Sequence, residues 1–284
     1  MTHNAGASIG PKYDLDPDEL NVLEAELVDT VRGGANSEGI TAVWLGPGHR
    51  YANIIRTQEA RLFPEVHDSS VGDENKTLFL ALVDTRPESS RVVHGATVCG
   101  AGAPDEGGPS AIAAAVSTGF ITIDSLIELG NFSAYEFENY YTSRNIDLTR
   151  CLSVETNFRI GQRVPNAWGL STSTIAYLMI FRFLVRCGAG RNRALVFADV
   201  NRVSRISFQR TGIMYAPLMG RTDLVTPEAA LGRFSFPVTI PVDDAFHELF
   251  LSMRAEIPEV FLGVDAILAG AANQVVLGSA EVRS

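Results

Sequence analysis

The residues best suited to chemistry lie between positions 150 and 221 of this 284-residue chain. Glu155 stands inside residues 152–158, Leu-Ser-Val-Glu-Thr-Asn-Phe, which we expect to form a strand, and a carboxylate there can accept a proton from a reacting group. A loop at 161–169 follows, and residues 169–174, Gly-Leu-Ser-Thr-Ser-Thr, open an apolar helix. A helix N-terminus has unpaired N–H groups and a positive dipole end, so it binds anions such as phosphate. This order predicts a base close to an anion-binding helix.

Charge supports an anionic ligand in the same part of the chain. Residues 156–221 hold ten arginines and a single acid, Asp199, so this segment carries +9 in a chain of net charge −10. Arginine makes planar, bidentate contacts with phosphate. Of all 23 basic residues only Lys12 and Lys76 are lysines. The codon usage of a GC-rich genome would also favour arginine over lysine. Codon bias does not explain the shortage of acids, so two interpretations stay open: a phosphate-bearing ligand, or a solvated face that meets an acidic partner segment.

The remaining reactive side chains give no second kind of site. Cys99, Cys151 and Cys187 stand far apart without CxxC spacing, which argues against a disulfide framework and a structural zinc site. No HExxH or similar spacing is present, so no metal is predicted. His94 lies in an apolar run, where we expect a hydrogen-bonded core histidine rather than a catalyst.

Composition narrows the class of protein. Hydrophobic residues make up 46% and charged residues 20% of the chain, which excludes a disordered protein. The acidic balance argues against a nucleic-acid coat protein and against a basic membrane-surface protein. The N-terminus has no apolar core, so it predicts no secretory signal. The most apolar stretch, 175–185, is too short to cross a bilayer and contains Arg182, so we expect a cytoplasmic protein.

Hydrophobic periodicity predicts an α/β fold. Helices are expected at 16–33, 51–63, in part of 120–141, at 171–187, at 201–210 and from 243; strands are expected at 41–45, 78–83, 92–98, 152–158, 194–198, 213–215 and 234–240. The turn-rich segment between 83 and 92 predicts a hairpin. The order strand, helix, strand predicts that 152–158 and 194–200 are parallel neighbours. We divide the chain into an N-terminal arm and helix at 1–36, a main domain at 37–242 and a C-terminal helical extension at 243–284.

These residues resemble the GNAT fold of N-acyltransferases over positions 40 to 220. The family's acyl-CoA loop, Arg/Gln-x-x-Gly-x-Gly/Ala, matches Asn166-Ala-Trp-Gly-Leu-Ser171. The family's strand, asparagine and later aromatic and glycine match the segment around Asn201, Phe208 and Gly212. Residues 50–65 resemble the first helix of members that act on amino acids, including acyl-homoserine-lactone synthases and N-acyl amino acid synthases.

The resemblance implies a mixed, mostly antiparallel sheet with one parallel pair between the fourth and fifth strands and helices on both faces. It implies an enzyme that moves an acyl group from an acyl-CoA or acyl-carrier-protein thioester to an amine of a small molecule, without a metal. The implied catalytic residues are Glu155 as base and Tyr215 as acid. The implied donor-binding residues are Asn157, Phe158, Arg159, Arg163, Gly169, Leu170, Ser171, Thr172 and Asn201.

The chain departs from the family at two places. Asn166 replaces the usual Arg or Gln of the loop, so Arg159 or Arg163 is expected to supply the missing cation. Phe208 stands where many relatives carry a tyrosine acid, and a phenyl ring cannot protonate a leaving thiolate. Tyr215, Ser207 or a water molecule must then do so, or no catalysis takes place.

Several alternatives stay open at this stage. Glu155 is either the base or the partner of a nearby arginine, and Asn201 either contacts the donor or caps its helix. The donor is either an acyl thioester or a charged tRNA, which the +9 segment would attract. The protein is otherwise a non-catalytic acyl-CoA-binding module, or a signal synthase that uses S-adenosylmethionine.

Overall fold

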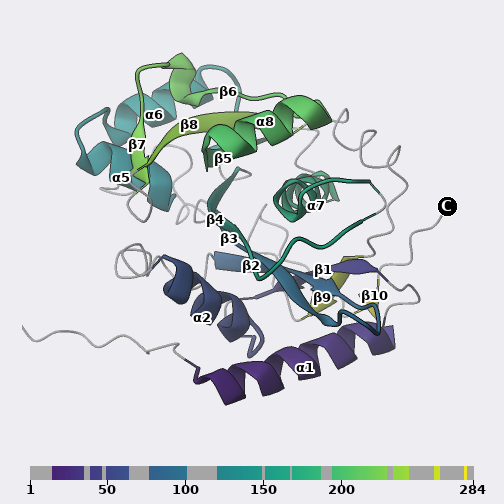
Figure 1. Ribbon diagram of the computed structural model, residues 1–284. Helices are drawn as coiled ribbons and strands as arrows, with labels where there is room; N and C mark the ends of the chain where they lie inside the picture. The colour runs from purple at the N-terminus through teal and green to yellow at the C-terminus, as the bar shows by residue number, and fades with distance from the viewer. Residues whose placement is uncertain are drawn as a thin grey trace, which may run out of the picture.

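A mixed sheet forms the centre of the protein in the computed structural model (Figure 1). The structure describes residues 15–34, 39–46, 49–63, 77–100, 120–148, 151–166, 168–186, 194–228, 233–242, 259–262 and 278–279. The strands are β1 (Ile40–Leu45), β2 (Thr77–Asp84), β3 (Arg91–Gly100), β4 (Leu152–Arg159), β5 (Ala194–Val200), β6 (Ala216–Pro217), β7 (Thr226–Glu228), β8 (Arg233–Val242), β9 (Glu259–Leu262) and β10 (Gly278–Ser279). Their order in the sheet is β10-β9-β1-β2-β3-β4-β5-β8-β6, and β7 also pairs with β8.

Helices cover both faces of this sheet, as the fold prediction required. They are α1 (Pro17–Gly34), α2 (Ala52–Leu62), α5 (Ile121–Glu128), α6 (Ala134–Thr142), α7 (Thr172–Arg186) and α8 (Arg202–Thr211), with a short 3-10 helix, η4 (Leu218–Gly220). α1 and α2 pack on one face over β1, β2 and β3. α5 and α6 pack around the inward-facing Phe197 of β5. The apolar α7 fills the opposite face, where Trp44 of β1 stacks on Phe183 at 4.6 Å between ring centroids.

The predicted parallel pair is present. Leu152 to Val154 of β4 pair with Val196 to Ala198 of β5, whereas β1–β2, β2–β3, β3–β4 and β5–β8 are antiparallel. The hairpin between β2 and β3 is also confirmed. A second parallel pair, between β1 and β9, was not predicted.

Two expected elements differ in the structure. The strand expected at 213–215 is absent there, and the two-residue β6 begins only at Ala216. The reason is the end of α8: Gly212 takes a left-handed conformation with φ of 75°, and the Ile213 N–H then donates back to the Phe208 carbonyl. The segment 243–284, expected to be helical, contributes β9 and β10 to the sheet. The helix expected from 243 lies outside the described residues, so the domain boundaries stay predictions.

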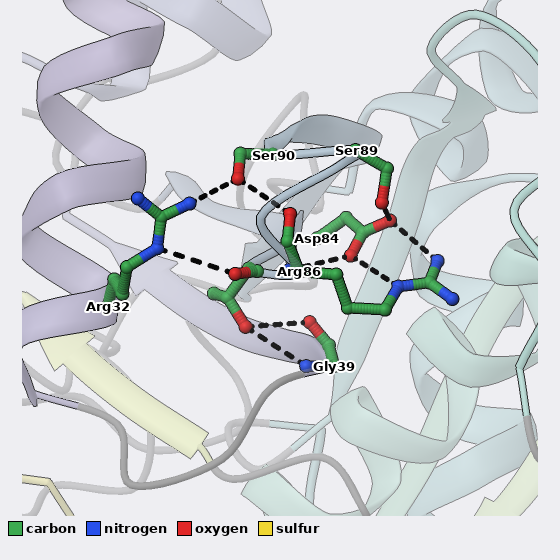
Figure 2. Close-up of polar contacts among 7 residues, drawn as sticks. Arg32, Gly39, Asp84, Arg86, Ser89 and Ser90 are labelled. Atoms are coloured by element: carbon green, nitrogen blue, oxygen red, sulfur yellow. Dashed lines mark hydrogen bonds and ion pairs between the residues drawn. The ribbon is translucent and has the colours of Figure 1, made fainter.

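A buried carboxylate organises the β2–β3 turn, and Arg32 ties that turn to the end of α1 (Figure 2). Asp84 is fully buried and accepts two hydrogen bonds from the Arg86 guanidinium, at 2.9 and 2.7 Å, and one from Ser89 Oγ at 2.7 Å. Arg32 of α1 donates to the Thr85 carbonyl and to Ser90 Oγ. Burial alone would raise the pKa of Asp84, but the hydrogen bonds from Arg86 and Ser89 hold it below its ordinary value. This part of the stability is therefore lost as the pH falls through that lowered value.

We expect Asp84→Ala to lower the free energy of unfolding by about 2–4 kcal/mol, because it removes a fully buried acceptor and leaves the half-buried Arg86 and Ser89 donors without it. A matched control exists in Asp223, which forms an Asp–Arg contact of similar length with Arg221 but is 65% exposed. Asp223→Ala should cost less than about 1 kcal/mol. Urea unfolding at pH 7 measures both variants. If both variants lost the same free energy of unfolding, burial of Asp84 would not make its pair with Arg86 more stabilising than the exposed pair of Asp223 and Arg221.

Candidate functional site

An extra residue in β4 sets the geometry of the candidate site. Thr97 of β3 pairs with Thr156 and Val98 pairs with Val154, so Glu155 is left over between two ladder positions. Such a bulge bends the strand and redirects its side chains. It lies directly beyond Val154, the last residue of β4 that pairs with β5. The two parallel strands therefore part at the position of Glu155.

Glu155 reaches the N-terminus of α5 rather than an arginine. Its Oε2 accepts hydrogen bonds from the N–H of Thr122 at 3.0 Å and from Thr122 Oγ1 at 2.9 Å. Its Oε1 is buried and has no hydrogen-bond partner among the described residues. Burial raises the pKa of Glu155 to about 7, although the side chain of Ser153 and the two bonds from Thr122 act against the shift, and the charge of Asp199 on β5 adds to it. A carboxylate with a pKa near neutrality suits a general base.

The parting of β4 and β5 leaves backbone donors on one edge of β4. The Ile160 N–H donates to the Val93 carbonyl of β3 at 3.0 Å. N–H groups alternate between the two edges of a strand, so the Phe158 N–H also faces β3 and the Asn157 N–H faces the gap. The Phe158 side chain is buried against α2. The gap therefore receives the Asn157 backbone, while the structure places the predicted donor residue Phe158 away from it.

The N-terminus of α7 carries further donors. Ser171 caps it, since its Oγ accepts from the Thr174 N–H at 3.1 Å. Within the described residues, the N–H groups of Thr172 and Ser173 have no hydrogen-bond acceptor. Gly169 has a φ of 64°, the left-handed conformation that favours glycine in the preceding turn. The predicted loop thus ends in a helix N-terminus with open donors, as anion binding requires.

Asn166 organises this loop rather than supplying a cation. Its Oδ1 accepts from the N–H groups of Trp168 and Leu170 at 3.1 and 3.3 Å, and its Nδ2 donates to the Leu170 carbonyl at 2.8 Å. Arg163 lies against the same loop, where its Nη2 approaches the Gly169 carbonyl at 3.5 Å. The exposed Arg163 therefore lies against the turn that leads into α7.

A buried histidine ties β4 to α7. His94 is fully buried, its Nε2 bonds Asn157 Oδ1, and its Nδ1 lies 3.0 Å from Thr172 Oγ1. Because the amide oxygen only accepts, Nε2 carries the proton and Nδ1 accepts from the threonine hydroxyl. Burial lowers the pKa of His94 to about 4, so the ring is neutral at pH 7. The expectation of a hydrogen-bonded core histidine is confirmed.

Other predicted residues have structural contacts of their own. Asn201 caps α8, since its Oδ1 accepts from the Ser204 N–H at 2.9 Å. The Tyr215 hydroxyl accepts from Arg205 Nε at 3.2 Å. Phe208 is buried, its ring 4.8 Å from that of Tyr177. Tyr215 is half-buried with its ring 6.0 Å from that of Phe208, and its place in a reaction stays a prediction.

The arginine-rich segment is less uniform than its charge suggests. Arg221 pairs with Asp223 at 2.6 Å, just beyond the segment, and donates to the Asn131 carbonyl. Arg182 is buried within α7. Within residues 156–221, the arginines whose side chains the structure shows as exposed are Arg159, Arg163, Arg202 and Arg210. Arg191, Arg193 and Cys187 lie outside the described residues.

Thr122 is a contact that sequence reasoning missed. It lies in a helix predicted only in outline, 33 positions before the carboxylate it supports.

Across the described part of the chain, no three His, Cys, Asp or Glu side chains come together to hold a metal ion. No helix there is long and apolar enough to span a membrane.

Comparison with solved structures finds synthases of the branch that the sequence resembles. BjaI, a CoA-dependent acyl-homoserine lactone synthase with SAM and isopentyl-CoA, is 13% identical with a TM-score of 0.49, covering 81% of this chain and 97% of BjaI. MesI, another CoA-dependent acyl-homoserine lactone synthase, is 9% identical with a TM-score of 0.44, covering 81% and 100%. FeeM, an N-acyl amino acid synthase from uncultured soil microbes, is 9% identical with a TM-score of 0.38, covering 85% and 95%.

No protein-family model matches this chain, and no curated protein does. At identities of 9–14%, the activity and substrates must be argued from this chain's own residues.

The raised pKa of Glu155 predicts a distinctive pH dependence of stability. Between the ordinary glutamate value near 4.5 and about 7, the unfolded chain is ionised while the folded chain holds a proton. Stability must then fall as the pH rises through this window, by up to about 3 kcal/mol. Glu155→Gln keeps an acceptor for Thr122 and should remove most of this fall. Urea unfolding of both proteins at pH 5 and pH 8 measures it, and parallel pH profiles would contradict the assignment.

Proposed function

We propose that this protein is an N-acyltransferase that moves an acyl group from a CoA thioester to an amine of a small molecule. The observation that carries the proposal is the parting of β4 and β5 at Glu155. It combines a strand edge with a free Asn157 N–H, the open donors of the α7 N-terminus and a buried carboxylate with a pKa near 7. Each meets one need of thioester aminolysis: a place for the oxyanion, a place for phosphate and a base.

The donor is expected to lie along the open edge of β4. Its phosphates would meet the N–H groups of Thr172 and Ser173, with Arg163 as the nearby cation. Its acyl carbonyl would accept from the Asn157 N–H, which is positioned by the strand and needs no rearrangement. An acyl-carrier protein presents the same thioester arm, so it remains a possible donor within this proposal.

The chemistry asks little of the protein beyond positioning and one proton acceptor. The amine nitrogen attacks the thioester carbonyl, and Glu155 takes the proton that the nitrogen loses. The oxyanion collapses, the carbon–sulfur bond breaks and the thiolate leaves. Tyr215 is the hydroxyl proposed to protonate it, since Phe208 cannot.

A non-catalytic acyl-CoA-binding module is the second candidate function. The burial of Phe208 at the tyrosine position favours it. The two functions differ in one measurement: a binding module gains thermal stability from acyl-CoA but releases no free CoA in the presence of amines.

Arg163→Ala tests the donor site. Removing the cation that lies against the loop should raise the donor dissociation constant about tenfold, as expected for losing one charge-assisted contact. The exposed side chain should leave the melting temperature unchanged. Calorimetry with octanoyl-CoA measures the affinity, and Arg210→Ala on the exposed side of α8 is the control. An affinity equal to that of the unaltered protein would remove Arg163 from the site.

Glu155→Gln tests the reaction. Loss of a general base should lower turnover about 10²–10⁴-fold while donor affinity stays constant. In the unaltered enzyme, kcat/KM should rise with pH through about 7 as Glu155 ionises. The variant should not show this rise of kcat/KM with pH. Its loss of turnover relative to the unaltered enzyme should shrink at high pH, where more of the amine arrives deprotonated. Release of free CoA from acetyl-, octanoyl- and palmitoyl-CoA with an amine panel measures this. A stable variant with full activity would exclude Glu155 as the base.

A further inference from the structure

A second buried carboxylate lies on the same face of the sheet as Glu155. Glu59 of α2 is 5% exposed, and its Oε2 accepts from Thr97 Oγ1 of β3 at 3.1 Å. Thr97 is the cross-strand partner of Thr156, the residue after Glu155. Directly opposed residues of an antiparallel pair point to the same face. Thr156 therefore lies on the face that Glu59 covers.

Two oxygens of this cluster lack partners. Thr156 is 8% exposed, and its Oγ1 has no hydrogen-bond partner among the described residues. Glu155 Oε1 is buried and unpartnered in the same way. A buried oxygen without a donor costs about 1–3 kcal/mol. The protein keeps two such oxygens next to each other in sequence at a bulge, where a ligand that brings N–H groups would satisfy both.

The cluster has an acidic character. Both carboxylates act on the Cys99 thiol, whose pKa is raised mainly by burial and further by the charges of Glu155 and Glu59. The charge of Asp199 on β5 also acts on Glu155. Arg56, one turn before Glu59 on α2 and stacked on the Phe79 ring at 4.9 Å, is an opposing charge on this face. The face therefore favours a cation over an anion.

We propose that Glu59, Thr156 and Glu155 form the binding site for the acceptor, and that this site selects an alkylammonium with no carboxylate beside its nitrogen. The inference rests on the proposed function. A primary ammonium has three N–H groups, and the cluster offers three acceptors: the Glu59 carboxylate, Thr156 Oγ1 and Glu155 Oε1. An α-amino acid would bring its own carboxylate close to Glu59 and Glu155, where like charges repel. Glu59 is the specificity-determining residue in this assignment.

Three pairs of compounds that differ only in a carboxylate test the selection. They are butylamine and norvaline, phenethylamine and phenylalanine, and 1,4-diaminobutane and ornithine. With octanoyl-CoA as donor, kcat/KM for the best amine should exceed that of its amino acid at least tenfold. The dead-end complex with free CoA provides a readout without turnover, since the same amine should raise the melting temperature and its amino acid should not.

Two variants assign the effect to the cluster. Glu59→Gln should raise the KM of the best amine about 10- to 100-fold, the range for losing a hydrogen bond to a charged group, with a smaller effect on kcat. Thr156→Val keeps the side-chain shape and the local charge and should raise KM about 3- to 10-fold. Neither should change octanoyl-CoA affinity. Asp29→Asn on α1, 77% exposed, is the control and should behave as the unaltered protein.

The outcomes separate this inference from the proposed function. Amine-induced stabilisation of the CoA complex that Glu59→Gln abolishes would support the site even if no acyl group is transferred. Transfer that favours the amino acids would overturn the inference and leave the acyltransferase intact. Equal amine binding by the unaltered protein and by a folded Thr156→Val variant would also overturn it, as would a failure of every amine to bind. If Glu59→Gln does not fold, the amine binding of the Thr156→Val variant tests the inference instead.

Discussion

One extra residue in β4 is the constraint on which the rest of the site depends. A strand paired on both edges would present alternating side chains to the two faces and no free backbone N–H groups. The bulge at Glu155, at the point where β5 leaves, changes both properties. It turns consecutive polar side chains toward α2 and α5, and it leaves the Asn157 N–H facing the gap where β5 leaves β4. Moving the bulge by one residue would change which side chains face α2 and α5 and which backbone N–H faces the gap.

The surrounding structure holds this irregular segment in place at several points. His94 on β3 fixes the Asn157 amide and the start of α7, so the open edge of β4 has a rigid frame. Gly95, its neighbour, lies directly beneath Phe158: a Cβ there would come within 2.8 Å of Phe158 Cζ and 3.1 Å of Ile55 Cδ1. Only glycine lets the Phe158 ring close the α2 side of the sheet. The strand can therefore lose its β5 partner without losing its position.

Sequence patterns predicted the sheet and the helices far better than the contacts of the site. The order of β4, the apolar helix α7 and β5 predicted the parallel pair, because a strand that returns to the same sheet through a helix runs parallel to the first. Periodicity carries no information on register, so the bulge at Glu155 could not be seen. The bond from Thr122 depends on where α5 begins, which is a property of packing. Glu59 looked like an ordinary helix residue because the partner that reveals it, Thr97, is 38 positions away.

The two faces of β4 carry opposite electrostatic character, and this separation bears on how the proposed reaction is ordered in space. The α7 side offers a helix N-terminus and Arg163, which attract an anionic donor, while the α2 and α5 side offers Glu59, Glu155 and Asp199, which attract a cationic acceptor. Neither reactant gains by entering the other's side, since each would meet its own sign of charge. The thioester carbonyl then lies at the strand edge between them, where the Asn157 N–H faces the gap. Loss of the proton from nitrogen moves positive charge onto the acidic face, and departure of the thiolate leaves negative charge near the α7 N-terminus. The charges that develop during acyl transfer are thus each produced on the side of the sheet that stabilises them.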